Sequence, residues 1–529
     1  MFKYHEDHRQ TELFGFKSSL SPAKQQKLQA TKEQAFYELI YCKIDESPFV
    51  ELYSDKKSRP NAPVNTMVAS LILKEHNCWT YEELFGQIDF DLRTRTALGL
   101  SDLEETPFCP ATLFNFQDRL STHYLQRGED LLEQVFDNLT TEQLKTLKIK
   151  TNIQRADSFL ASSNIRTYSR LQLLVEVLLR LHRILSPEDQ QALSELFAPY
   201  VKQTSGQYIY RLKQTELSAH LEQIAQVYHS LHQRLASTYG DTEIFKIFAR
   251  VYSEHFTEVN DKIAVIAAQE RSSSILQSPD DVDATYRKKR DQESWGHTIH
   301  VNETAHPDNH LNLITDVEVA ANNTDDSKIL NARLEKMVEK TSDLDELHTD
   351  GGYGSEDNDE KMEELGIRHI QTAIKGRTAA VSFRIEQLVE TTYRVSCPYQ
   401  KSIVQVTRKR FKASFEQSVC DQCPLGSVCP TIQQKTQRVL YFTHEAYLRN
   451  KRHRSLESIP TERRTLRANV EATVREFRRR MSDGKLRVRG KFKTRVFAVL
   501  NAIGINFGRI VRFQRAQRIQ SVKMQLNMA

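Results

Sequence analysis

Several features of membrane and secreted proteins are missing from this 529-residue sequence. No apolar run of about 18 residues stands out, so we expect no transmembrane helix. The opening stretch, MFKYHEDHRQTELFGFK, lacks the apolar centre of a signal peptide. Seven cysteines, an odd number in a long chain, argue against a disulfide framework. We therefore expect a cytoplasmic protein without a membrane partner.

Net charge is also small, at +5, but it is unevenly distributed. Residues 449–529 contain 22 Lys or Arg and 5 Asp or Glu, whereas the preceding 448 residues contain 52 basic and 64 acidic residues. A basic C-terminal segment on an otherwise acidic chain indicates a polyanionic partner, of which DNA or RNA is the first candidate. The alternative is a basic tail that is simply solvated. Apolar residues at helical spacing from Val496 to Val511 favour a folded surface over disorder.

The length exceeds that of a single hydrophobic core, so we expect about three or four domains. Residues 1–140 read as short helices separated by turns. This pattern is typical of a helix-turn-helix module, but also of any small helical bundle. The helices expected here are Asn61–Asn77, Thr80–Ile88 and Pro110–Leu120. Residues 166–275 are predicted to be almost wholly helical, with an apolar heptad seam from Leu217 to Leu235.

Between and after these helical regions the pattern becomes α/β. The expected strands are 147–159, Gly296–Asn302, Leu311–Val319, Leu344–Thr349 and Ile367–Ala373, and the expected helices are Asp325–Lys340 and Ser355–Leu365. Asp157 falls on the apolar face of the first strand, which costs free energy unless it is paired or binds a metal; capping the next turn is the alternative. Asp350 follows the fourth strand. The two aspartates can therefore lie on neighbouring strands.

Near the C-terminus, Ser458–Gly484 is predicted to form one helix with a single apolar stripe. One carboxylate, Glu471, lies at the edge of this stripe among Arg467, Arg475 and Arg478. One interpretation is an amphipathic surface helix with a Glu–Arg ion pair. The other is a metal-binding carboxylate with arginines placed for phosphate.

Four cysteines fall in a short β-rich stretch, residues 375–449, that interrupts the α/β pattern. They are Cys397, Cys420, Cys423 and Cys429. Four thiolates in a long intracellular chain predict a tetrahedral zinc site, which would be structural because four ligands leave no open position. The spacing is looser than that of paired CxxC motifs, so free thiols are the alternative.

In order and spacing, Asp157, Asp350 and Glu471 resemble the catalytic acids of DDE transposases of bacterial insertion sequences. The resemblance is carried by Ala156-Asp157-Ser158, by Asp350-Gly351-Gly352-Tyr353 and by Arg467-x3-Glu471-x6-Arg478. The last motif is similar to the family's YREK signature, with Arg in place of Lys and with Arg464 in place of Tyr. The Lys-to-Arg change keeps the charge and offers a bidentate phosphate grip.

This resemblance implies a multidomain α/β protein with a ribonuclease-H-like mixed sheet core. The implied parts are an N-terminal helix-turn-helix domain (1–140), the core (141–165 and 276–374), a helical insertion (166–275), a cysteine-containing insertion (375–449) and a C-terminal catalytic part with a basic tail (450–529). It also implies two Mg²⁺ (or Mn²⁺) ions on Asp157, Asp350 and Glu471. The residues implied to contact DNA are Arg467, Arg475, Arg478 and Tyr353.

The implied activity is transposition. The enzyme would bind the terminal inverted repeats of its element as a homodimer, cut them, and join the 3′-hydroxyls to target DNA, in the bacterial cytoplasm at the nucleoid. Two alternatives remain: a metal-dependent nuclease without strand transfer, and a domesticated DNA-binding protein without catalysis.

Overall fold

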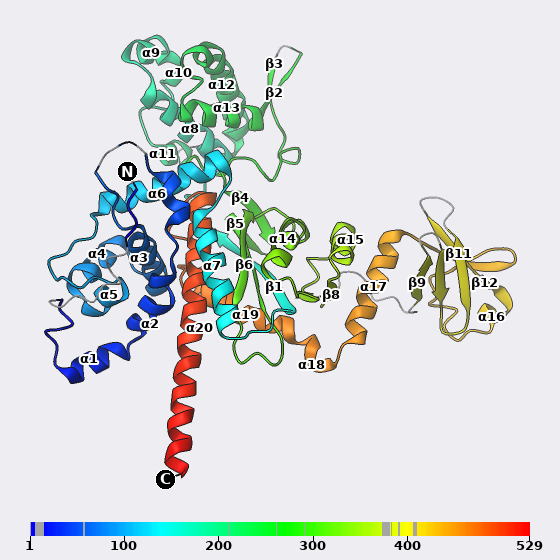
Figure 1. The fold of residues 1–529 in the computed structure, drawn as a ribbon. Coiled ribbons are helices and arrows are strands. Elements are labelled where there is room, and N and C mark those ends of the chain that lie inside the picture. Colours follow the sequence, from blue (N-terminus) through cyan, green and yellow to red (C-terminus); the bar gives the residue numbers. More distant parts are fainter. Residues whose placement is uncertain are drawn as a thin grey trace.

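The computed structural model describes residues 2–5, 15–54, 56, 59–210, 212–260, 262–289, 291–372, 381, 383–389, 392–405 and 410–528. Helices surround a six-stranded sheet, and a helical region and a small β-rich region extend from this centre (Figure 1). The predicted mixed α/β class is therefore confirmed. The expected strand end at Ala373 lies outside the described residues.

The central sheet places β1 and β7 side by side. Its strands are β1 (Ile153–Ser162), β4 (Thr285–Lys289), β5 (Gln292–Thr304), β6 (Ile314–Ala321), β7 (Glu346–Thr349) and β8 (Arg368–Gln371). β5 pairs antiparallel with β1, β4 and β6, whereas β7 is parallel to both β1 and β8. Asp157 in β1 and Asp350, directly after β7, thus belong to neighbouring strands, as predicted.

β1 differs from its predicted bounds. It begins at Ile153 and ends at Ser162, instead of running from residue 147 to 159. The alternating pattern is misleading before Ile153, because Leu147 closes the preceding helix, α7 (Leu131–Thr146). Asp157 consequently lies in the middle of β1, opposite Val301 of β5, and not near a strand end.

Helices cover both faces of the sheet. Ala156 points into an apolar cluster with α14 (Asp326–Lys340) and α15 (Glu356–Glu364). Side chains alternate along a strand, so Asp157 and Phe159 face the opposite side. There the ring of Phe159 packs against that of Phe477, with 5.5 Å between centroids. Asp157 therefore faces the helical layer that contains Glu471.

The N-terminal helices share their core with the C-terminal helix α20 (Lys491–Met528). They are α1 (Pro22–Gln29), α2 (Lys32–Leu39), η2 (Tyr41–Lys43), η3 (Ser47–Leu52), α3 (Val64–Asn77), α4 (Tyr81–Phe90), α5 (Leu92–Ala97), α6 (Pro110–Arg127) and α7. The predicted helices correspond to α3, α4 and α6. The ring of Phe36 meets that of Phe507 edge-on at 5.2 Å, so the two ends of the chain fold together.

Residues 166–275 have a core of their own. The elements here are α8 (Arg170–Ile184), α9 (Pro187–Ala192), α10 (Ser194–Phe197), α11 (Ser205–Tyr210), η4 (Gln214–Glu216), α12 (Leu217–Tyr239), α13 (Glu243–His255), β2 (Phe256–Val259) and β3 (Lys262–Val265). The predicted seam is confirmed from Ile224 to Leu235 of α12, where Ile224, Tyr228, Leu231 and Leu235 are buried in this separate core. Its predicted first residue, Leu217, is exposed.

The cysteine-containing region is β-rich and also has its own apolar cluster. Its elements are β9 (Arg384–Val389), β10 (Thr392–Ser396), β11 (Lys401–Gln405), β12 (Phe411–Glu416), α16 (Gln417–Asp421), β13 (Ile432–Gln433) and β14 (Gln437–Phe442). The chain then returns to the central sheet through α17 (His444–Ser458), which lies beside α15 (Figure 1).

The single helix predicted over Ser458–Gly484 is wrong. The segment divides into α18 (Thr461–Arg464), η5 (Leu466–Asn469) and α19 (Val470–Arg478), and Ser458 is the last residue of α17. The break follows from contacts with the sheet, because the Leu466 carbonyl accepts a hydrogen bond from Arg155 of β1. The predicted apolar stripe is confirmed at Val470, Val474 and Phe477, which are buried.

The long helix α20 bears on the expectation of no transmembrane helix. By length and composition alone, Lys491–Ser521 is apolar enough to cross a membrane, although 67% of its most apolar 18-residue window is buried inside the fold. This one helix does not conflict with that expectation, because a buried core helix passes the same test. Its burial is typical of a core helix. The exposed, basic C-terminal part of α20 projects beyond the other helices (Figure 1).

Candidate active site

Three carboxylates that are distant in sequence converge on one side chain, that of Arg467 in η5. Its Nη2 lies 2.7 Å from Oδ2 of Asp157 and 3.9 Å from Oδ2 of Asp350, and its Nη1 lies 3.5 Å from Oε1 of Glu471. The exposed fraction of the acidic side chains rises from 12% for Asp157 to 34% for Asp350 and 61% for Glu471. The acids thus extend from the sheet to the surface, where a long substrate can approach.

Asp157 is the most buried of the three. Burial raises the pKa of its carboxyl group, the Arg467 guanidinium counteracts this, and the nearby charge of Asp350 adds to the rise. The backbone N–H of Ser158 donates a 2.9 Å hydrogen bond to Oδ1. A carboxylate held in this way is stabilised by a cation close to it.

Asp350 is oriented by the tight turn that follows β7. The N–H of Gly352 donates to Oδ1 of Asp350 at 2.7 Å. A Cβ on Gly352 would lie 3.0 Å from that oxygen and 3.0 Å from Oδ2 of Asp326, so glycine allows both carboxylates to approach this turn. Oδ1 of Asp326 accepts a 2.6 Å hydrogen bond from the hydroxyl of Ser158, the residue after Asp157.

Asp326 was not predicted from the sequence. It stands beside Asp325 at the start of α14, where acidic residues ordinarily serve as helix caps. That position hides its contact with Ser158 and its place beside the turn at Gly352. The sequence offered one indication of a further role: two aspartates, Asp325 and Asp326, stand at the start of α14, although one residue is enough to cap a helix.

The other residues implied to contact DNA differ in their exposure. Arg475 is exposed, with its Nε 3.4 Å from the carbonyl oxygen of Glu471. Arg478 is also exposed, and its Cζ lies 6.0 Å from the ring centroid of Phe159 in β1. Tyr353 is fully buried, with its hydroxyl 3.0 Å from Nδ1 of His300. In this position Tyr353 packs behind the acids, and a direct contact with DNA does not fit.

A buried glutamate that the sequence did not single out anchors η5 and α19. Glu303 of β5 is 0% exposed and accepts hydrogen bonds from Arg155 and Arg509 at 2.7 Å each and from the Thr473 hydroxyl at 2.6 Å. Arg155 also donates to the carbonyl oxygen of Leu466, at 3.0 Å. Glu303 therefore fixes the segment that carries Arg467 and Glu471.

A second buried glutamate, Glu346 of β7, anchors α18. It forms ion pairs with Arg463 of α18 and Arg368 of β8, and Nε2 of His348 lies 2.7 Å from its Oε1. Burial alone would raise its pKa, but hydrogen bonds from His348 and Arg368 outweigh burial and lower it to about 2. The sequence did predict the short strand that contains Glu346. A glutamate inside such a strand could have indicated a buried charge.

The four predicted zinc ligands gather around one small cavity. Cys397, Cys420, Cys423 and Cys429 all line it, and its volume is about 30 Å³. Gln400 bridges two of them, with its N–H 3.2 Å from Sγ of Cys397 and its Nε2 3.3 Å from Sγ of Cys420. All four are free thiols. A cavity of this size has room for a single small ion or water molecule.

Ligand spacing distinguishes these clusters from a third one. Among the described residues, Glu356, Glu360 and His444 are the group whose ligand atoms all lie within 4.8 Å of one another. The three acids at Arg467 and the four cysteines are spaced more widely. For the acids the reason is direct, because the guanidinium stands between them. Their oxygen donors fit hard divalent cations, provided that Arg467 moves aside.

Two transposase family models match parts of the chain. The family model described as "Transposase DDE domain" matches residues 393–511, and the one described as "Transposase domain (DUF772)" matches residues 25–119. No curated protein and no solved structure matches the chain. The first range includes Arg467 and Glu471, and neither range includes Asp157 or Asp350.

These matches support a DDE-type transposase. Such an enzyme acts on DNA, which it cuts or transfers, and the family generally uses divalent metal ions.

Proposed function

We propose that this protein binds the terminal inverted repeats of a bacterial insertion sequence and catalyses their cleavage and strand transfer. The observation that carries the proposal is the meeting of Asp157, Asp350 and Glu471 at one guanidinium. The strand order also supports a ribonuclease-H-like core, with β6, β5 and β1 antiparallel and β7 and β8 parallel to β1. The short helices α3 to α6 support a helix-turn-helix-type DNA-binding region.

The three carboxylates are the proposed ligands of two Mg²⁺ or Mn²⁺ ions, because carboxylate oxygens are the donors that these cations prefer. When bound, such ions supply an activated water or 3′-hydroxyl and stabilise the leaving oxygen. Asp350 is oriented for this role by Gly352, and Glu471 by the anchoring of α19 on Glu303. In the described conformation Arg467 supplies the positive charge that the acids need. Once they have cations, it is available to a DNA phosphate.

DNA would follow the basic surface near these acids. Arg475 is exposed beside Glu471, and Arg512, Arg515, Arg518 and Lys523 are exposed along the projecting part of α20. Binding through such contacts falls steeply with salt, since it rests on phosphate neutralisation. The N-terminal helices would recognise the base sequence of the element ends. We propose that the active form is a homodimer bound to paired element ends. It would act in the bacterial cytoplasm, at the nucleoid.

The cysteine cavity is the proposed site of one structural Zn²⁺. Its four thiols match a Cys₄ donor set, and the ion would replace the hydrogen bonds from Gln400. Elemental analysis should find zinc that is lost when Cys420 and Cys423 are both changed to serine. Retention of all zinc in that double variant would contradict the assignment.

The decisive experiment incubates the protein with DNA carrying the element's ends, Mg²⁺ or Mn²⁺, and a target plasmid. Nicks at the ends together with joined products are the expected result. Nicks without joined products would instead identify a nuclease. Binding without any cleavage would identify a non-catalytic DNA-binding protein.

A further inference from the structure

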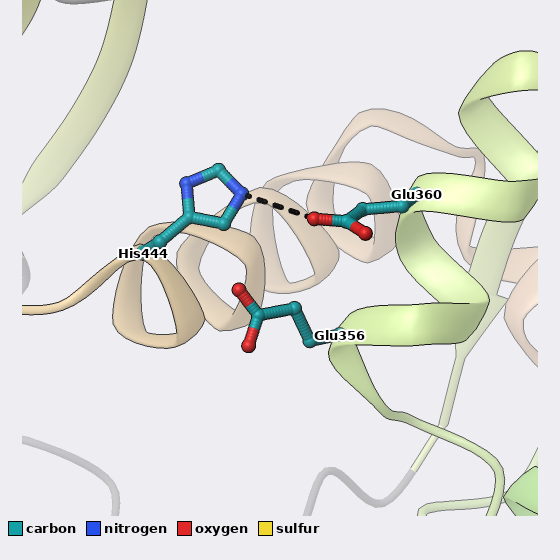
Figure 2. A group of neighbouring side chains, drawn as sticks. All are labelled: Glu356, Glu360 and His444. Carbon is teal, nitrogen blue, oxygen red and sulfur yellow. Dashed lines mark ion pairs between the residues drawn. The ribbon is translucent and has the colours of Figure 1, made fainter.

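The tightest metal-type cluster in the described residues lies away from the three acids, between α15 and α17. Glu356 and Glu360 stand one turn apart on α15, and His444 is the first residue of α17. Figure 2 shows the histidine ring pointing towards both carboxylates across the space between the two helices. Nε2 of His444 lies 3.9 Å from Oε1 of Glu360, and all three ligand atoms lie within 4.8 Å of one another.

We propose that Glu356, Glu360 and His444 bind a divalent transition-metal ion of the zinc class, which joins α15 to α17. An imidazole nitrogen with two carboxylates is a donor set that zinc accepts, and water would complete the coordination. Magnesium is disfavoured, because it prefers an all-oxygen shell. The site is separate from the cysteine cavity and from the acids at Arg467.

The histidine is already oriented for this role. Its other ring nitrogen, Nδ1, lies 3.3 Å from the hydroxyl of Tyr393, a buried residue of β10. When Nδ1–H donates to that hydroxyl, Nε2 keeps its lone pair and faces the glutamates. Metal-binding histidines typically have such a partner on the second nitrogen, which fixes the ring and its tautomer.

Charge in the space between α15 and α17 gives a second, independent reason. At two other contacts each acid has a cationic partner, since Glu363 pairs with Lys451 at 2.9 Å and Asp359 pairs with Arg452 and also lies 3.7 Å from Nδ1 of His369. At His444, two carboxylates face a single imidazole. Within the described chain, Glu356 has neither a hydrogen bond nor an ion pair from its side chain. The surplus negative charge here is what a divalent cation would neutralise.

The required movement is small. Zinc ligands lie at about 2.0–2.2 Å from the ion, so the ligand atoms must come somewhat closer than they are. Glu356 and Glu360 are exposed, and rotation of their side chains suffices without moving either helix. The ion pair of Asp359 with Arg452 already holds the two helices together.

The position of this site gives the ion a structural role. α17 carries the chain from the cysteine-containing region back to the segment with Arg467 and Glu471, and α15 begins just after the turn at Asp350. A metal ion here would therefore fix the β-rich region relative to the sheet. This consequence does not depend on what reaction the protein catalyses.

The test uses the full-length protein with excess Mg²⁺ and measures bound zinc per chain after dialysis, together with a calorimetric zinc titration. The variants are Glu356→Gln/Glu360→Gln and His444→Gln. Glu363→Gln, on the same helix but paired with Lys451, is the matched control. We expect both site variants to hold one zinc fewer than the parent, while the control holds as many. Tyr393→Phe should weaken this zinc about tenfold.

Equal zinc content and equal titration curves in the parent and in both site variants would overturn the proposal. Loss of zinc from the Glu363→Gln control would overturn it as well, because the effect would then come from the general charge of α15. A disturbance of the β-rich region in His444→Gln would appear as a changed melting curve in the presence of chelator. In that case the test rests on Glu356→Gln/Glu360→Gln, whose two side chains are exposed. Since no DNA is present, the result is independent of whether the protein cuts DNA.

Discussion

Two groups of acidic residues in this protein are neutralised to very different extents. The first, which we call the charge network, joins α7, β6, α14 and α20 and consists of Asp130, Glu133, Asp316, Glu318, Arg333, Lys340 and Arg495. In it, Asp316 meets both Arg333 and Lys340, and Arg495 binds Asp130 at 2.6 Å and Glu318 at 2.8 Å. In the second group, Asp157, Asp350 and Glu471 share Arg467 as their one cationic partner among the residues that the structure describes.

Under the proposed function, this contrast separates acids that hold the fold from acids that bind metal ions. Each carboxylate of the charge network has at least one cationic partner within 3 Å, which offsets the cost of burial. At the active site a single guanidinium lies 2.7, 3.5 and 3.9 Å from the three acids, so most of their negative charge is left over. Three acids against one guanidinium is a larger excess than four acids against three cations in the charge network, and this excess is what the proposed metal ions would neutralise.

The largest effect is expected at the unbalanced group. Asp157→Asn keeps the size of the side chain and removes its charge, so Mg²⁺-dependent cleavage should fall at least about 10³-fold, or about 4 kcal/mol of transition-state stabilisation. DNA binding should persist in a gel-shift assay, and Glu457→Gln on α17 serves as an exposed control. Cleavage at the parent rate would remove Asp157 from the site.

In the charge network the loss should appear in stability. Arg333→Met removes a cation that contacts Glu133 at 2.7 Å and Glu318 at 2.9 Å and also pairs with Asp316, which leaves buried carboxylates without full compensation. We expect the free energy of unfolding to fall by about 3–5 kcal/mol, measured by urea denaturation. Cleavage per folded molecule should not change. A large loss of cleavage without a loss of stability would show that the charge network also takes part in catalysis.

The same network should respond to acid. Burial alone would raise the pKa of Glu133, but Arg495 and Arg333 outweigh burial and lower it to about 2. Because the folded value lies below the unfolded one, its contribution of about 3 kcal/mol is complete above roughly pH 4.5 and disappears as the pH falls towards 2. The stability difference between the parent and Glu133→Gln should therefore narrow over that range. A difference that stays constant with pH would show that the charge of Glu133 is not involved.

Periodicity predicted most of the elements that form the sheet and its helices. α14 begins one residue after its predicted start and ends as predicted, and β6 lies within three residues of its predicted bounds, whereas β5 begins four residues earlier than predicted. Two failures have the same cause. The pattern from Leu147 continues into β1 although a turn separates them, and the stripe from Leu466 continues into α19 although its first residues form the separate 3₁₀ helix η5. Tertiary contacts such as Arg155 to the Leu466 carbonyl break a chain whose local pattern shows no break.

The three predicted acids were recognisable because each occurs in a local motif. Glu303, Glu346 and Asp326 have no such motif. Their roles depend on partners distant in sequence, as Glu303 depends on Arg509 and Thr473. The convergence on Arg467 was likewise invisible, since the sequence placed that arginine with DNA phosphates. Partners of buried charges emerge only when the chain folds.

The smallest expected effect, and the sharpest test of the contrast, concerns Asp326. It touches the site through Ser158 and lies across Gly352 from Asp350, but it makes no contact with Arg467 in the described structure. Asp326→Asn preserves the hydrogen bond from Ser158 and removes a charge, so cleavage should fall by at most about tenfold, or about 1.4 kcal/mol. Asp325→Asn, next to it and without a capping bond from its side chain, is the control. A loss as large as that of Asp157→Asn would make Asp326 a fourth member of the unbalanced group.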